Sequence, residues 1–356
     1  MNKALAILLL AACAVPAASQ STATLKGIDV YRSASLDVDK VEQALRGRID
    51  SYMRTINDQR HSVQKNRERL KDELESAARA FGDFTYVDMV YDHYATSAEH
   101  SAYITFDVVD AKDAKTRMPF GPAPKAAVSD PGGLLEAWQR YSAMGLALRA
   151  RGELSFERPT CPAFYCLWGS ATPELAALEK GFVDDVPKQQ AALLDVLARD
   201  GRPSRRAAAA QLLSYLQDGR LLSETMTGCL SDPSPEVRAA ALQVLSDVAS
   251  YHKNVFIDVQ KVIAALDYPT VSDRSKALGV LVGLVDNPDY RTYLTSRAVP
   301  RLLALIRMNN PSAHDLSFTL LGIISGQSYG GREYEAWDKW AGTVISSATA
   351  PAVDGH

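Results

Sequence analysis

The chain has 356 residues, of which 47% are hydrophobic, so it is long enough to build two domains, each with its own core. Its 39 basic and 42 acidic residues give a net charge of −3, which argues against a nucleic-acid-binding protein and against a polybasic membrane surface. Beyond the first residues no uncharged run approaches the length of a membrane span, so we expect no transmembrane segment.

Residues 1–19 have the features of a secretory signal peptide. A lysine near the start is followed by an apolar run from Ala4 to Ala12, and a stretch of small residues ends near Ser19. This pattern predicts an exported protein, in the periplasm of a Gram-negative bacterium.

The same segment contains the run LAAC, which ends at Cys13 and resembles a bacterial lipobox. In a lipobox the cysteine is lipidated and becomes the new N-terminus, so Cys13 would anchor the protein to the outer membrane. The alternative is an ordinary signal peptide that is cleaved after Ala17 or Ser19. The sequence leaves both open.

Residues 27–110 predict a small α+β domain. Its expected elements are a strand at Gly27–Tyr31, one long helix or two shorter ones within Asp37–Phe81, and strands at Phe84–Tyr91 and Ala102–Val109 around a polar hairpin loop, Asp92–Ser101. The order strand, helix, helix, strand, strand resembles that of POTRA domains, which are exported modules that bind other proteins.

The predicted hairpin loop carries Asp92 and His93 at one end and Glu99 and His100 at the other. A closed hairpin would bring two imidazoles and two carboxylates together, a ligand set that suits Zn²⁺. We favour the alternative, a polar loop in solvent. If the cluster forms, the N-terminal half would hold the site of a metal-dependent envelope enzyme.

Residues 111–133 contain several prolines and end in two glycines, so they are expected to form a linker. A helix over Leu134–Leu148 follows. Cys161 and Cys166 then form a close pair, which we expect to be a disulfide in an oxidising compartment. A redox-active pair is the alternative, although thioredoxin-like sites have two residues between their cysteines rather than four.

The second half of the chain repeats one pattern. Residues 232–245 read DPSPEVRAAALQVL and the chain upstream reads DGRPSRRAAAAQLL, so that Arg206 and Arg238 fall in register 32 residues apart. A third copy places Arg274 36 residues further on, and a degraded fourth copy places His314 another 40 on. Repeats of this period are typical of stacked helical arrays.

Each copy predicts a helix, a tight turn and a second helix. Ser234, Thr270 and Asn310 stand where a side chain would cap the second helix, and Pro235 occupies a first helical position. Apolar residues then recur at helical spacing.

This pattern resembles the HEAT-repeat family, in which an aspartate of the inter-helix turn and an arginine of the second helix form a ladder between repeats. The resemblance covers about residues 172–344, and with a helical lead-in the array would span residues 134–344. The ladder residues that it implies are Asp200, Arg206, Asp232, Arg238, Asp267 and Arg274. Trp337 and Trp340 would close the array, and residues 345–356 would form a flexible tail.

Motifs that carry chemistry are missing from the sequence. It has no GxSxG elbow, no GxxxxGK[ST] loop and no GxGxxG after a strand, so we expect no catalytic residues and no cofactor. The predicted fold is predominantly α: a small α+β domain followed by an all-α HEAT-like solenoid. Such an array offers an extended surface, which favours a non-enzymatic scaffold or adaptor that binds a protein partner.

Overall fold

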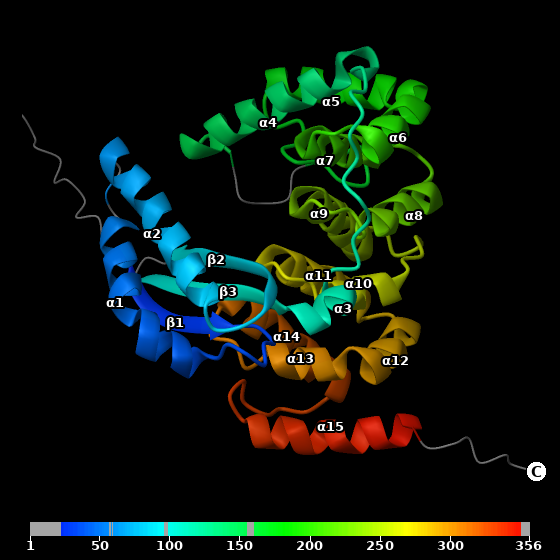
Figure 1. The fold of residues 1–356 in the computed structure, drawn as a ribbon. Coiled ribbons are helices and arrows are strands. Elements are labelled where there is room, and N and C mark those ends of the chain that lie inside the picture. The colour runs from blue at the N-terminus through cyan, green and yellow to red at the C-terminus, as the bar shows by residue number, and fades with distance from the viewer. Residues whose placement is uncertain (1–22, 57, 59, 96–98, 155–159, 350–356) are drawn as a thin grey trace, which may run out of the picture.

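The computed structural model describes residues 23–56, 58, 60–95, 99–154 and 160–349. A small sheet with two helices comes first and a curved stack of helices follows (Figure 1). The predicted signal peptide 1–19, with Cys13, lies outside the described residues, as do residues 350–356. Within the described ranges, no helix is long and apolar enough to cross a membrane.

The N-terminal elements follow the predicted order. They are β1 (Thr24–Val30), α1 (Val38–Ile56), α2 (His61–Arg79), β2 (Phe84–Ala95) and β3 (His100–Asp110). In the described part of this half the strands form one sheet in the order β1-β3-β2, with β1 parallel and β2 antiparallel to β3. Helices α1 and α2 bury one face of the sheet, in a core that includes Val41, Leu45, Ile49, Leu74 and Phe106.

The strands of the hairpin are longer than predicted. Asp92 pairs with Tyr103 and Ala95 pairs with His100, so most of the expected loop Asp92–Ser101 belongs to β2 and β3. Edge-to-face packing of Tyr94 on Tyr103, at 5.7 Å between ring centroids, accompanies this extension. The prediction of a polar loop in solvent over that whole range is therefore wrong.

The apolar segments of the repeats fold into helices, as predicted. The helices after the sheet are α3 (Ala114–Arg117), α4 (Leu134–Ala150), α5 (Pro173–Asp185), α6 (Gln190–Arg199), α7 (Pro203–Leu212), α8 (Gly219–Cys229), α9 (Pro235–Tyr251), α10 (Val259–Ala265), α11 (Val271–Leu284), α12 (Pro288–Arg297), α13 (Val299–Leu305), α14 (Pro311–Ser325) and α15 (Tyr334–Thr349). Ser234, Thr270 and Asn310 cap α9, α11 and α14 by accepting backbone N–H groups of the first turn. A small sheet domain followed by a helical, HEAT-like array confirms the predicted fold class.

The predicted linker, residues 111–133, is bound to the array along its length. The Gly121 N–H donates to the Ser231 carbonyl at 2.9 Å, and Ala126 forms a parallel bridge with Asp200. Figure 1 shows this strap running from α3 across the stack to α4. After α3, Pro119, Pro122 and Pro124 disfavour a helix without preventing contact, because the inter-helix turns that the strap crosses offer backbone partners.

The end of the chain also departs from the prediction. Helix α15 continues to Thr349, so the first residues of the expected flexible tail 345–356 are helical.

Candidate functional site

Two arginines of the repeats each reach the next repeat along the array. The Arg206 guanidinium donates to both carboxylate oxygens of Asp232, at 2.9 and 2.7 Å, and to the Asp200 carbonyl at 2.9 Å. Arg238 binds both oxygens of Asp273 at the same two distances. These paired contacts fix the angle between neighbouring repeats, since the planar guanidinium binds a carboxylate in one geometry.

The implied role of Asp267 in this ladder is wrong. Asp273, in the first turn of α11, takes the place that was assigned to Asp267. Asp267 lies one residue out of the repeat frame and instead forms ion pairs with Arg301 of α13 and with Arg32, which follows β1. Asp200 begins the ladder by accepting from the Val128 N–H of the strap and from Arg205.

The ladder ends on the N-terminal domain. Arg274 does not meet an aspartate of a fourth repeat: its Nη2 donates to Asp107 Oδ1 of β3 at 2.6 Å. Asp107 Oδ2 also accepts the N–H of Val271, so the carboxylate holds the first turn of α11. The Arg274 guanidinium lies 4.3 Å from the centre of the Tyr31 ring, as Arg238 lies 4.0 Å from that of Phe120 in the strap.

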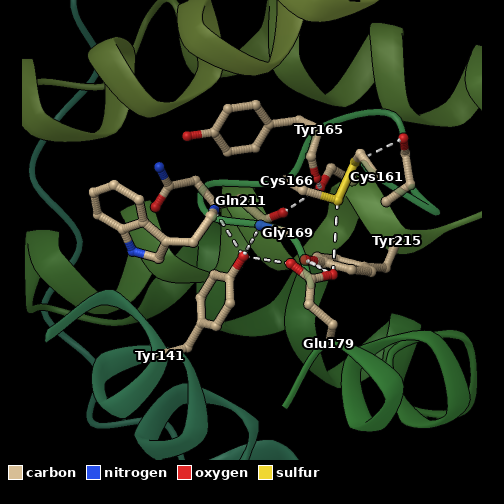
Figure 2. Close-up of a disulfide and its surroundings, with 11 residues drawn as sticks. Tyr141, Cys161, Tyr165, Cys166, Gly169, Glu179, Gln211 and Tyr215 are labelled. Atoms are coloured by element: carbon tan, nitrogen blue, oxygen red, sulfur yellow. Dashed lines mark hydrogen bonds between the residues drawn. A yellow bond between two sulfur atoms is a disulfide. The ribbon is translucent and has the colours of Figure 1, made fainter. Parts of the chain in front are cut away.

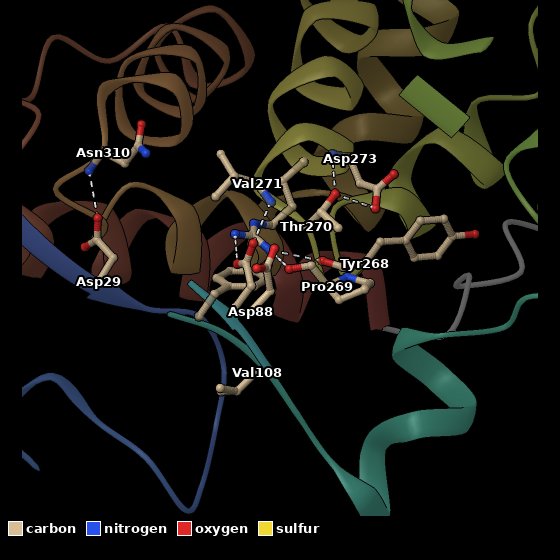
Figure 3. A network of polar contacts seen from close by, with 12 residues as sticks. Asp29, Asp88, Val108, Tyr268, Pro269, Thr270, Val271, Asp273 and Asn310 are labelled. Atoms are coloured by element: carbon tan, nitrogen blue, oxygen red, sulfur yellow. Dashed lines mark hydrogen bonds and ion pairs between the residues drawn. The ribbon is translucent and has the colours of Figure 1, made fainter. Parts of the chain in front are cut away.

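A second buried carboxylate of the sheet binds the next inter-helix turn. Asp29 of β1 accepts the N–H groups of Asn309 and Asn310, at 2.7 and 2.9 Å. Figure 3 shows Asp29 and Asn310 facing each other between the sheet and the helices. Gly27 permits this approach, because a Cβ there would lie 2.3 Å from Cβ of Asn309. The sheet is therefore fixed to two successive turns of the array.

Burial shifts the acid strength of these carboxyls. It raises the pKa of Asp107 to about 6, although the charge of Arg274 acts in the opposite direction. Burial also raises the pKa of Asp29, against the hydrogen bonds from the two asparagines. Asp107 and Asp29 lie between the sheet domain and the helical array, so their role is to hold these two parts together.

The proposed metal cluster does not assemble. His93 Nε2 lies 3.2 Å from His100 Nδ1, but Asp92 binds the Asn310 side chain at 2.6 Å and Glu99 forms an ion pair with Lys26. Among the described residues, no three His, Cys, Asp or Glu side chains are arranged to hold a metal ion. Alternation along β2 separates Asp92 from His93, because successive side chains of a strand point to opposite faces.

Cys161 and Cys166 form a disulfide in the segment between α4 and α5 (Figure 2). Beside it lies the buried carboxyl of Glu179, which accepts hydrogen bonds from the hydroxyls of Tyr141 and Tyr215. The sequence pattern predicted the disulfide, but nothing in the local sequence pointed to Glu179.

The predicted cap residues lie at the end of the array. Trp337 is fully buried and its ring centre lies 6.0 Å from that of Trp340. Its indole N–H donates to the Gly330 carbonyl at 3.0 Å. His314, at the arginine position of the last copy, contacts Asp315 and the Gly331 carbonyl, so it does not continue the ladder.

Phe256 lies in the loop between α9 and α10 with 76% of its surface exposed. Two pockets of about 790 and 470 Å³ flank it and share Asn254, Val255, Phe256 and Asp258 in their walls. We call these two pockets the Phe256 site. The first is also lined by Phe164 and Gly219, and the second by Tyr290.

The backbone of this loop is held in place while the Phe256 ring points outward. Ser223 Oγ donates to the Phe256 carbonyl at 2.7 Å, and the Tyr290 hydroxyl accepts the Ile257 N–H at 2.9 Å. Lys253 Nζ donates to the Gly283 carbonyl at 2.5 Å. An exposed aromatic ring on a fixed backbone needs little ordering when it binds a partner. The sequence analysis did not find Phe256, since a lone phenylalanine in a loop carries no motif.

Comparison with known proteins adds one family. The family model named HEAT repeat matches residues 222–252, which cover most of α8 and α9. Searches of the curated proteins and of the solved structures returned no significant match. No comparison supports the likeness of the N-terminal half to POTRA domains. This part of the helical array is thus similar to a HEAT repeat, and repeats of this family commonly mediate protein interactions.

Proposed function

We propose that this protein is a non-enzymatic adaptor that binds a protein partner at the Phe256 site. The exposed Phe256 ring between two pockets carries this proposal. Aromatic side chains contribute strongly to protein interfaces when pockets surround them, and burial of one phenylalanine ring stabilises a complex by about 1.5–3 kcal/mol. The HEAT repeat at residues 222–252 supports it, because Ser223, Glu224 and Thr227 of that repeat line one wall of the first pocket.

The charges of the first pocket indicate what kind of contact it makes. Arg220 pairs with Glu224, and Lys261 with Asp258, so acidic and basic groups balance along the wall. A partner would therefore bind mainly through apolar and aromatic groups, with hydrogen bonds at the rim.

Crosslinking in cells tests this proposal. A photoreactive amino acid in place of Phe256 should give one abundant covalent adduct with another protein. The matched control is Leu146 on α4, which is 63% exposed but lines neither of the two pockets. Equal adducts from both positions, or none from position 256, would refute partner binding at the Phe256 site.

We also propose that the protein works after export, in the periplasm of a Gram-negative bacterium, either free or lipid-anchored through Cys13. The signal-like residues 1–19 support export, and so does the Cys161–Cys166 disulfide, because disulfides persist in oxidising compartments. The intact mass of the mature protein tests this: a lipid on Cys13 and cleavage near Ser19 give different masses. A mature chain that still begins at Met1 would contradict export.

A further inference from the structure

The two sulfurs of the disulfide differ in their surroundings. Cys166 is buried, with 5% of its surface exposed, while Cys161 is only partly buried. Sγ of Cys166 lies 3.7 Å from Oε2 of Glu179, a residue with 1% of its surface exposed (Figure 2). An incoming thiol therefore reaches Cys161 first, and the sulfur that leaves is the one beside the carboxyl.

The hydrogen bonds around Glu179 show where its proton can lie. Tyr141 accepts the N–H groups of Trp168 and Gly169 at 2.8 and 2.7 Å, so its own hydroxyl proton points to Oε1 of Glu179. The Tyr215 hydroxyl donates to Oε2 at 2.8 Å. A disulfide sulfur has no hydrogen, so a proton between Oε2 and Cys166 must come from the carboxyl itself.

The groups that face Glu179 come from three elements. They are Tyr141 of α4, Tyr215 of the turn after α7, and Cys166 of the segment before α5. Burial raises the pKa of Glu179, while the hydrogen bonds from the two tyrosines oppose this shift. A carboxyl with this environment keeps its proton at higher pH than an exposed glutamate does.

We propose that Cys161 and Cys166 form a thiol–disulfide exchange site that reacts with dithiols, and that Glu179 supplies the proton that Cys166 takes up when the disulfide opens. The partner is a dithiol, of a protein or a small molecule. The loop between the two cysteines contributes Phe164 to the first pocket of the Phe256 site, but the exchange chemistry does not depend on the partner that binds there.

The exchange balances in two steps. A thiolate of the dithiol attacks Sγ of Cys161 and forms a mixed disulfide, and the electron pair of the broken bond passes to Cys166, which takes the proton of Glu179. The second thiol of the dithiol then attacks the dithiol sulfur that is bound to Cys161. Cys161 leaves and takes up the proton that this second thiol loses. The dithiol is oxidised, the cysteine pair gains two electrons, and water returns a proton to Glu179.

Reduction of the full-length folded protein by dithiothreitol tests this proposal. Alkylation followed by peptide mass analysis follows Cys161 and Cys166 separately from the buried Cys229. We expect Glu179→Gln to slow reduction at pH 7 by about a hundredfold, the lower end of the range for general acid catalysis. The matched control is Glu174→Gln, an exposed change on the same helix, which should leave the rate unchanged.

The pH profile separates proton transfer from a structural effect. Each rate constant is divided by the fraction of dithiothreitol that is thiolate at that pH. The corrected rate constant of the wild type should fall with rising pH as Glu179 loses its proton. The corrected rate constant of Glu179→Gln should not change with pH. Tyr141→Phe removes a hydrogen bond to the carboxylate, so the fall should move to higher pH. If Glu179→Gln does not fold, the pH profiles of the wild type and Tyr141→Phe still show whether Glu179 donates the proton. A flat wild-type profile, equal rates in Glu179→Gln and wild type, or opening only in denaturant would overturn the proposal.

Discussion

Arg274 of α11 and Asp107 of β3 form a buried ion pair, 2.6 Å between Nη2 and Oδ1, that joins the helical array to the sheet domain. In the two preceding repeats the arginine meets an aspartate of the next repeat. At Arg274 a strand residue 167 positions earlier in the chain takes that role. The sheet domain therefore occupies the position of a further rung in the ladder.

Breaking this ion pair should destabilise the whole protein. We expect Arg274→Ala to lower the free energy of unfolding by about 3–5 kcal/mol, because it leaves the Asp107 carboxylate buried without its charged partner. Urea denaturation followed by circular dichroism measures the change. Arg220→Ala breaks the exposed pair with Glu224 and should cost at most about 1 kcal/mol. Equal losses would contradict the buried rung.

The stability should depend on pH through Asp107. Its pKa is raised to about 6 in the folded protein from an ordinary value near 3.8, so the folded state binds the proton more tightly than the unfolded state does. The stabilisation of the folded state by this carboxyl is greatest below pH 4 and decreases as pH rises towards about 6. The difference in unfolding free energy between wild type and Asp107→Asn should therefore change across this window and stay constant above it. A constant difference from pH 4 to pH 8 would contradict the shift.

Close approach of β1 to the array should make Gly27 sensitive to any side chain. Gly27→Ala would place a Cβ within 2.3 Å of Asn309 and should cost about 1–3 kcal/mol of stability. The control is Gly47→Ala in α1, where no atom lies within 4 Å of the added carbon and where alanine favours the helix. Thermal unfolding distinguishes the two variants. A tolerated Gly27→Ala would show that the sheet does not contact the turn at Asn309.

The disulfide should contribute to stability through the short loop that it closes. Replacing both Cys161 and Cys166 by serine should lower the free energy of unfolding by about 2 kcal/mol, as expected for a loop of this size. Guanidinium denaturation without reductant measures the loss. With excess reductant throughout, the wild type should approach the variant, and a difference that persists would have another origin.

The repeat architecture could be predicted because its determinants are local. Ser234, the arginine at 238 and the apolar spacing all lie within one helical segment, and the matching family model covers this segment. The aspartate of the third rung could not be assigned by register alone. Both Asp267 and Asp273 lie near the turn, and only the packing of Arg238 on the next repeat selects Asp273.

The rest of the molecule depends on contacts between distant segments. Asp107 reads in the sequence as one more polar residue of an alternating strand, and its partner lies 167 residues away. The strap at 111–133 has the composition of a linker, because many of its contacts join its backbone to distant turns and to Asp200, and no sequence pattern reveals such contacts. Glu179 and Phe256 could not be predicted for the same reason. The tyrosines that bind Glu179 and the pockets beside Phe256 come together only when the chain folds.

Partner binding at the Phe256 site is tested most directly by the affinity of the purified protein for the partner identified by crosslinking. Isothermal titration with wild type, Phe256→Ala and Leu146→Ala would give the three dissociation constants. We expect Phe256→Ala to weaken binding by at least about 2 kcal/mol, or roughly thirtyfold, as for a residue central to an interface, and Leu146→Ala to leave it unchanged. Equal affinity of Phe256→Ala and wild type would contradict the assignment of this surface as the binding site.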